Sequence, residues 1–166
     1  IAQAHLAAKF NRKGLPVVDN YIYCICSDGD LMEGVSYEAA SIAGHLKLGN
    51  LIYLYDDNKI TIDGSTDIAF TEDVTKRFAA SGWFVLEVAD GNDLKAIEKA
   101  IKDAQKVKNK PSLIRVHTII GFGMPKQGTS KAHSDAPGEE AVKETKRNLG
   151  MPEDKSFYVP KEVSAH

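Results

Sequence analysis

Short runs of apolar residues alternate along this chain with longer segments in which apolar residues recur every three or four positions. The short runs are typical of buried strands, and the longer segments are typical of helices. The pattern predicts strands at residues 20–26, 51–56, 83–88 and 112–116, and helices from the start of the chain to about Asn11 and at residues 33–46, 72–80, 93–107 and 139–148. Because strands that alternate with helices of 10–15 residues favour parallel pairing, we predict an α/β fold with a parallel sheet flanked by helices.

Three of the predicted strands are apolar throughout, at residues 21–26, 51–55 and 83–86. Continuous apolar strands are typical of a parallel sheet that is buried on both faces. In the helix at 33–46, small residues such as Ala40, Ala43 and Gly44 suit close packing. For the helix at 93–107 the pattern predicts Asn92 as N-cap and an apolar stripe that consists of Leu94, Ile97, Ala100, Ile101 and Ala104.

The last third of the chain is organised differently. A Gly-rich segment runs from Gly121 to Gly138, and the tail from Met151 onward, with two prolines, reads as a linker. We therefore predict one domain at residues 1–150 and the start of a linker at residues 151–166. The chain opens inside a helical pattern without an initiator methionine, so we expect it to be the interior of a larger polypeptide.

Composition excludes several classes of function. The formal net charge is −2, which leaves no electrostatic footprint for nucleic acid or for an anionic membrane. No apolar stretch approaches the ~20 residues that span a bilayer, and the amino end lacks the basic region of a signal peptide. Cys24 and Cys26 lie two apart on one predicted strand, where pairing is geometrically unfavourable. Two thiols without a disulfide framework favour a reducing, cytoplasmic setting; a Cys-x-Cys metal site is an alternative, but no second thiol pair completes it.

The candidate chemistry lies where two predicted strands end. Asp28 and Gly29 follow the first strand, and Asn58 follows the second. Because the carboxyl ends of parallel strands meet at one edge of a sheet, these residues can hold Mg²⁺ and a diphosphate there, with Gly29 allowing close approach of phosphate oxygens. Two simpler interpretations stay open at this point, namely that Asp28 caps a helix and that Asn58 forms an Asx-turn.

Asp28, Gly29 and Asp30 also allow a rival hypothesis. Phosphatases of the haloacid dehalogenase type present a nucleophile and a general acid as Asp-x-Asp after a strand. Such enzymes have Thr or Val two residues after the second Asp, where this chain has Met32, and no later pair of acids follows a strand here. Walker-type and Gly-x-Gly-x-x-Gly signatures are both absent.

Two further residues are candidates. Glu33 lies at a predicted helix start, where the helix dipole favours a carboxylate. His133 lies in the Gly-rich segment, where it is either solvated or able to donate to a phosphate or a sugar hydroxyl. The other four histidines, His5, His45, His117 and His166, are predicted to be structural or surface residues, and Trp83 a core residue.

Taken together, these residues resemble the transketolase family. The resemblance is carried by residues 27–34 (Ser-Asp-Gly-Asp-Leu-Met-Glu-Gly), 38–52 and 55–64 (Tyr-Asp-Asp-Asn-Lys-Ile-Thr-Ile-Asp-Gly), continues through Gly82-Trp83, residues 120–123 and His133, and covers essentially the whole chain. The block at 27–64 is highly specific, whereas a lone Asp-Gly…Asn spacing would indicate only thiamine-diphosphate enzymes in general. The implied fold is the diphosphate-binding domain of a thiamine-diphosphate enzyme, without its first part.

The resemblance implies a role for each site residue. Asp28 and Asn58 would bind a divalent cation, Mg²⁺ or Ca²⁺, through side-chain oxygens, and Ile60 through its main-chain carbonyl. Gly29 would place its amide against the cofactor diphosphate, which Asn58 would also touch. Glu33 would join a carboxylate network at the interface of a homodimer, and His133 would contact cofactor and sugar.

The chain departs from the family at Ser27, where Gly is usual, and at Ser134-Asp135 after the histidine, where Gly is usual. The family's upstream histidines and Gly-rich loop would precede Ile1, and the acid that activates the aminopyrimidine would follow His166.

The implied activity is transfer of a two-carbon ketol unit from a ketose phosphate to an aldose phosphate, in the pentose phosphate pathway, by way of thiamine diphosphate. We expect the 166-residue chain by itself to bind this cofactor weakly and to have no turnover. Dihydroxyacetone synthase is a related activity that these residues leave open. A non-catalytic module that keeps the shape of the site for dimerisation is a third hypothesis.

Overall fold

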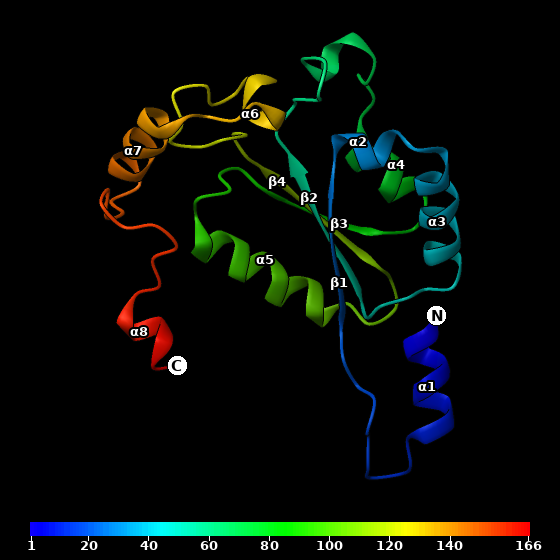
Figure 1. Ribbon diagram of the computed structural model, residues 1–166. Coiled ribbons are helices and arrows are strands. Elements are labelled where there is room, and N and C mark those ends of the chain that lie inside the picture. The colour runs from blue at the N-terminus through cyan, green and yellow to red at the C-terminus, as the bar shows by residue number, and fades with distance from the viewer. The chain divides into compact units, whose positions relative to one another are not determined.

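The computed structural model describes all 166 residues, which form two compact units (Figure 1). Unit 1 comprises residues 1–59 and 66–118, and unit 2 comprises residues 60–65 and 119–166. Unit 1 contains the sheet. The boundary that we place at residues 150 and 151 stays a prediction.

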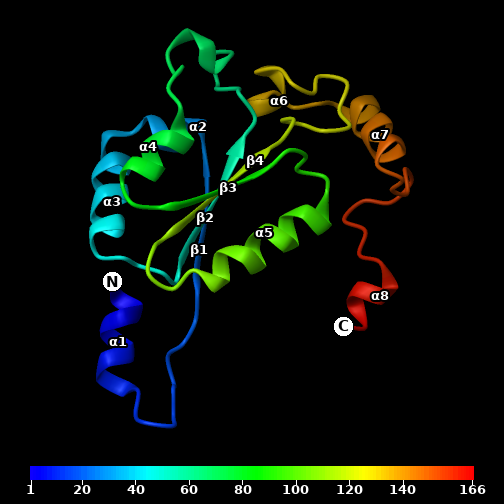
Figure 2. The ribbon, with the colours of Figure 1, turned by 180° about the vertical axis from the view of Figure 1, so that it is seen from behind.

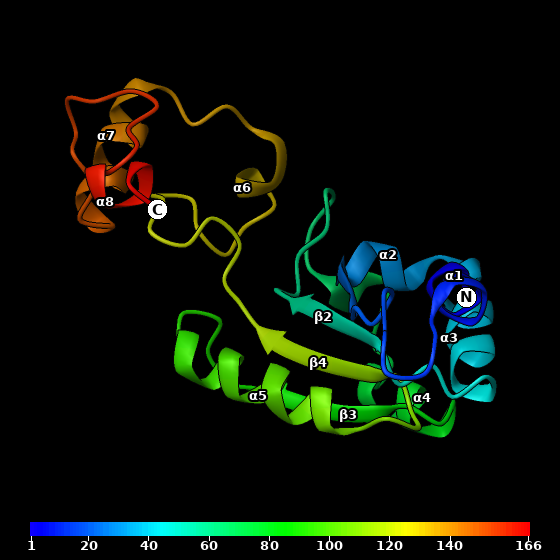
Figure 3. The same ribbon diagram turned by 90° about the horizontal axis from the view of Figure 1, so that it is seen from below.

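Four parallel strands form the sheet of unit 1, in the order β1-β2-β4-β3. They are β1 (Ile22–Ser27), β2 (Leu51–Asp57), β3 (Phe84–Val88) and β4 (Ser112–His117). The arrowheads of β2 and β4 point the same way in Figure 3. Ser27 is the register partner of Asp56, and Asp57 is the partner of His117, so the ends of β1, β2 and β4 lie at one edge. The predicted fold class and its four strands are confirmed.

Helices cover both faces of this sheet, and alternate side chains of β2 and β4 face opposite ways. The helices of unit 1 are α1 (Ala2–Phe10), α2 (Asp28–Met32), α3 (Gly34–His45), α4 (Val74–Ala80) and α5 (Leu94–Lys106), with a 3₁₀ turn at Thr66–Ile68. Tyr55 and Leu113 pack into one buried cluster with residues of α2, α3 and α4, whereas Ile52 and Ile114 pack into a second with residues of α5. Figures 1 and 2 show α5 on one side of the sheet and α3 and α4 on the other.

The prediction that the strand at residues 21–26 is buried on both faces is wrong for β1. The side chain of Ile25 is 79 % exposed, and Tyr23 is exposed as well. The physical reason is that β1 is an edge strand, while α5 packs on β2, β3 and β4. The apolar stripe of α5 is confirmed at Ala100 and Ala104, which are buried, and at Ile97 and Ile101, which are partly buried against the same cluster, but not at Leu94, which lies in the first turn and is exposed.

The cap of α5 also differs from the prediction. Asp93 is the N-cap, and its carboxylate accepts from the backbone N–H groups of Lys95 and Ala96, each at 3.0 Å. The backbone N–H of Asn92 instead donates to the Asp90 carboxylate at 2.8 Å. Asn92 therefore belongs to an Asx-turn that precedes the helix.

Small residues on α3 allow the helix to approach its neighbours, as predicted. A Cβ on Gly44 would lie 1.7 Å from the carbonyl oxygen of Ser81, so no other residue fits there without movement. Trp83 is buried, as predicted, and its indole N–H donates to the carbonyl of Ala40 at 2.9 Å. The larger apolar side chains of α3, namely Val35, Ile42 and Leu46, are exposed.

Unit 2 contains α6 (Lys131–Ser134), α7 (Glu139–Asn148) and α8 (Lys161–Ser164). The helix at 139–148 was predicted, whereas α6 in the Gly-rich segment and α8 in the tail were not. Asn148 at the end of α7 donates through its side-chain amide to the carbonyl of Gly123 at 2.8 Å, which ties the helix to the Gly-rich segment. Across both units, none of the helices combines the length and the apolar character that crossing a membrane requires.

Candidate functional site

The structure brings Asp28 and Asn58 to the same edge of the sheet. Asp28 is the first residue after β1, and Asn58 is the first residue after β2. These strands are direct parallel neighbours, with Ser27 opposite Asp56. The predicted placement at two neighbouring strand ends is therefore confirmed.

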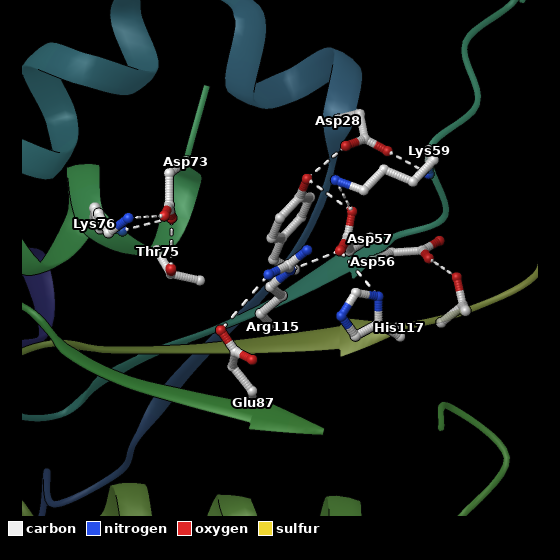
Figure 4. A network of polar contacts seen from close by, with 12 residues as sticks. Asp28, Asp56, Asp57, Lys59, Asp73, Thr75, Lys76, Glu87, Arg115 and His117 are labelled. Carbon is white, nitrogen blue, oxygen red and sulfur yellow. Dashed lines mark hydrogen bonds and ion pairs between the residues drawn. The ribbon is translucent and has the colours of Figure 1, made fainter. Parts of the chain in front are cut away.

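The Asp28 carboxylate is buried and held on both oxygens (Figure 4). The Tyr55 hydroxyl donates to Oδ1 at 2.5 Å, and the backbone N–H of Lys59 donates to Oδ2 at 3.1 Å. Lys59 has a φ of 62°, a left-handed conformation that costs a non-glycine residue about 1 kcal/mol. Because Lys59 follows Asn58 directly, this contact ties the Asp28 carboxylate to the turn that carries Asn58.

Local hydrogen bonds explain why β1 turns into a helix at Asp28. Ser27 is the N-cap of α2, and its backbone N–H and its hydroxyl both donate to the Asp30 carboxylate, at 2.8 and 3.0 Å. The backbone of Ser27 is extended, with φ −118° and ψ 179°, which any residue adopts. The turn therefore accepts Ser27 in place of the glycine that is usual in the family. Because Ser27 is the N-cap of α2, the interpretation of Asp28 as a helix cap is wrong.

Packing within the chain does not require a glycine at position 29. A Cβ built on it would meet no atom within 4 Å, and its φ is not in the left-handed region. The space next to its backbone is open within the chain, as close approach of a ligand to the amide requires.

A second buried aspartate lies beside the first. The Asp57 carboxylate pairs with Arg115 Nε at 2.6 Å, with Lys59 Nζ at 3.0 Å and with His117 Nδ1 at 3.1 Å. Arg115 and His117 come from β4, so this cluster binds the ends of two strands together (Figure 4). The sequence did not predict it, and His117, expected to be structural or at the surface, is half-exposed within it.

The pKa values of the two aspartates shift in opposite directions. Burial raises the pKa of Asp28, and the charge of Asp57 adds to this effect, while the hydrogen bonds from Tyr55 and Lys59 oppose it. Burial alone would also raise the pKa of Asp57, but the hydrogen bonds and charges of Lys59 and Arg115 outweigh it and lower the pKa. The charge of Lys59 also acts on Asp28, but Asp28 forms no ion pair like those of Asp57, and a metal ion beside it would stabilise its charged form.

The donor set fits a hard cation together with a diphosphate. No group of three or more His, Cys, Asp or Glu side chains is arranged to hold a metal ion by itself. The carboxylate of Asp28 and the amide oxygen of Asn58 would need further oxygens, which is how Mg²⁺ binds beside phosphates. The amide nitrogen of Asn58 donates to Asp56 Oδ2 at 3.4 Å, so it is the nitrogen of this group that faces Asp56.

The thiols offer no competing site. Cys24 and Cys26 are free, and burial raises the pKa of Cys26 to about 12. A metal ligand must be a thiolate, which this environment disfavours.

The remaining predicted residues lie elsewhere. Glu33 is exposed between α2 and α3, at the N-cap position of α3, without a side-chain capping bond. Ile60 belongs to unit 2, where it pairs with Ser65 in an isolated bridge. His133 is exposed on α6 in unit 2, and the acid that follows it, Asp135, lies 3.6 Å from Lys126 Nζ. The roles of all three stay predictions.

The geometry does not favour a phosphatase. Asp30, the general acid of that hypothesis, turns back to cap α2 through Ser27.

Comparison with known proteins gives a consistent result. The family described as "Transketolase, thiamine diphosphate binding domain" matches residues 1–166. A transketolase from Nostoc sp. is 58 % identical over 165 residues, which are 98 % of this chain and 24 % of that protein.

Solved structures show the same fold. An arginine-to-leucine variant of transketolase from Pichia stipitis superposes with a TM-score of 0.95 at 51 % identity, over 99 % of this chain and 24 % of that one. The complex of that species' transketolase with sedoheptulose-7-phosphate gives a TM-score of 0.94 at 52 % identity, again over 99 % and 24 %. The chain therefore spans about a quarter of the length of the relatives it matches.

Proposed function

Since the chain belongs to the transketolase thiamine diphosphate-binding family, we propose that it anchors the Mg²⁺–diphosphate end of thiamine diphosphate in an enzyme that transfers ketol units. The observation that carries this proposal is the buried Asp28 carboxylate, held next to the turn of Asn58 but not paired with a side-chain cation. A divalent ion between these two strand ends offsets that buried charge.

Each residue has a defined task in this proposal. Asp28 and Asn58 bind Mg²⁺, or Ca²⁺, through side-chain oxygens, and Ile60 binds it through its main-chain carbonyl. Gly29 presents its amide to the diphosphate, which the open space beside it supports. These are hard oxygen donors of the kind that both ions prefer.

The proposed reaction moves a two-carbon ketol unit from a ketose phosphate to an aldose phosphate. Bound thiamine diphosphate supplies a nucleophilic carbon and an electron sink. This chain supplies position, because it fixes the diphosphate end and so directs the reactive end toward the sugar. His133 contacts cofactor and sugar. The structures of the Pichia stipitis enzyme with sedoheptulose-7-phosphate and with xylulose-5-phosphate support sugar phosphates as the substrate class.

We further propose that the functional enzyme is a cytoplasmic homodimer of the pentose phosphate pathway. Exposed apolar side chains on α3, among them Val35 and Ile42, support a subunit contact at this helix. Glu33 stands at the start of the same helix and joins a carboxylate network across the interface. The 166-residue chain by itself binds the cofactor weakly and has no turnover.

The test is Mg²⁺-dependent binding of thiamine diphosphate to the full-length protein, measured by calorimetry with and without a chelator. Asn58→Ala removes one ligand oxygen and abolishes metal-dependent binding. A non-catalytic module of the same shape would lose nothing on this change. Binding that is indifferent to both the metal and Asn58 would refute the proposal.

A further inference from the structure

Tyr55 joins the two buried aspartates at the end of β2. The residue is 1 % exposed, and its hydroxyl lies 2.5 Å from Asp28 Oδ1 and 3.3 Å from Asp57 Oδ1. One hydroxyl proton therefore faces two carboxylates, and the shorter contact directs it to Asp28.

We propose that Tyr55 is a positioning residue for the metal site, which orients the Asp28 carboxylate before the cation binds. This inference rests on the proposed function, because it requires a cation at Asp28. Tyr55 itself contacts neither the metal nor the substrate.

The packing of the Tyr55 ring restricts the position of its hydroxyl oxygen. Its ring belongs to the buried cluster that also contains Cys26, Leu31 and Leu113. Only rotation about the Cα–Cβ bond moves the hydroxyl oxygen of a tyrosine side chain, because the oxygen lies on the axis of the Cβ–Cγ bond, and the packed cluster restricts that rotation. The oxygen at the end of the ring cannot follow a shift of the Asp28 carboxylate without disturbing the core.

The second contact of the hydroxyl is equally restrained. Asp57 is held by Arg115, Lys59 and His117, so its carboxylate cannot move away from Tyr55. Lys59 also reaches Asp28, since its backbone N–H donates to Oδ2 while its Nζ pairs with Asp57. Tyr55 and Lys59 thus hold the two oxygens of Asp28 from two directions.

This arrangement leaves the Asp28 carboxylate competent to bind a cation. Each carboxylate oxygen has two lone pairs, so one hydrogen bond on each leaves acceptor capacity for a metal ion. Groups that orient the ligands of a metal ion typically change its affinity 10- to 100-fold. Without the hydroxyl, Asp28 would have to be ordered by the metal ion itself.

Tyr55→Phe tests this inference, and Tyr53→Phe is its matched control. Tyr53 lies on the same strand and packs in the same cluster, with its ring against Trp83 at 5.0 Å, and its hydroxyl makes no hydrogen bond in the structure. Mg²⁺ is titrated calorimetrically into each full-length variant in excess thiamine diphosphate. The thermal midpoint of each metal-free protein reports on the fold.

We expect Tyr55→Phe to weaken Mg²⁺ binding by about 10- to 100-fold relative to Tyr53→Phe. Saturating Mg²⁺ should restore the affinity for thiamine diphosphate and the turnover, because only the orientation of a ligand has changed. The metal-free midpoint of Tyr55→Phe should lie only modestly below that of Tyr53→Phe, because one buried hydrogen bond is lost while the fold is kept.

Two results would overturn the inference. Equal Mg²⁺ affinity of the two variants would show that the hydroxyl does not orient Asp28. A metal-free Tyr55→Phe that is unfolded, or much less stable than Tyr53→Phe, would show a structural role instead. If the wild-type protein itself lacks Mg²⁺-dependent binding of thiamine diphosphate, it is the proposed function that fails. Titration of the wild-type protein beside the two variants identifies that case.

Discussion

The ends of β1 and β2 each bury an aspartate, but the two carboxylates have opposite surroundings. Asp57 at the end of β2 lies among Arg115, Lys59 and His117, and the hydrogen bonds and charges of Lys59 and Arg115 lower its pKa against the effect of burial. Asp28 after β1 receives only two hydrogen bonds, and burial raises its pKa. The charge of Asp57 is compensated by ion pairs within the chain, whereas Asp28 forms no ion pair of this kind. In the proposed function this difference leaves Asp28 for a cation, while Asp57 stabilises the edge of the sheet.

Asp28→Asn should have the largest effect on cofactor binding. It removes the only carboxylate among the proposed ligands, so Mg²⁺-dependent binding of thiamine diphosphate should be lost in calorimetry. The metal-free protein should be at least as stable as wild type, because a buried charge without a cationic partner has gone. A substantial drop in the thermal midpoint of the metal-free variant would show that Asp28 is a structural residue.

Asp57→Asn, unlike Asp28→Asn, should destabilise the metal-free protein. It leaves Arg115 and Lys59 without their buried counter-charge, which should lower the free energy of unfolding of the metal-free protein by roughly 3 kcal/mol. Urea denaturation measures this change. An unchanged midpoint would mean that the contacts of Asp57 with Arg115 and Lys59 do not stabilise the sheet edge.

Gly29→Ala should separate binding from folding. A Cβ at Gly29 meets nothing in the chain, so the thermal midpoint of the metal-free protein should not fall. The methyl group should interfere with the diphosphate and weaken cofactor binding roughly tenfold, about 1.4 kcal/mol. Unaltered affinity in a calorimetric titration would remove Gly29 from the proposed site.

Asp57 should also contribute to the loss of stability in acid, although by less than the changes above. Because the folded-state pKa of Asp57 lies below its ordinary value of 3.8, its contribution is complete above that pH and is lost as the pH falls toward the folded-state pKa. Unfolding of the wild type, followed between about pH 5 and pH 2, should therefore show an acid loss that is smaller in Asp57→Asn. Equal acid losses in the two proteins would contradict the lowered pKa.

Much of this arrangement could be predicted from local patterns. Apolar runs placed all four strands, and the positions of Asp28 and Asn58 after two of them predicted where both residues would lie. The short helix α2 was missed, since five residues are too few to show a helical period and its start depends on the capping bonds between Ser27 and Asp30. The exposure of Ile25 could not be anticipated, because strand order decides which strand is at the edge.

The cluster around Asp57 could not be predicted from the sequence, for a related reason. Arg115 and His117 are about sixty residues away along the chain, and only the register of β2 against β4 brings them to Asp57. The sequence signal was present in their alternation on β4, where Leu113, Arg115 and His117 share one face, but nothing in one sequence says which strand pairs with which. Tyr55 was likewise read as part of an apolar run, although its position two residues before Asp57 places both on one face.

The most direct test is a crystal structure of the full-length protein grown with thiamine diphosphate and Mn²⁺, whose anomalous scattering locates the metal ion. The account predicts one ion at about 2.1 Å from an oxygen of Asp28 and from the side-chain oxygen of Asn58, with diphosphate oxygens completing its coordination. An ion bound elsewhere, or a cofactor bound with its diphosphate away from these two strand ends, would contradict it.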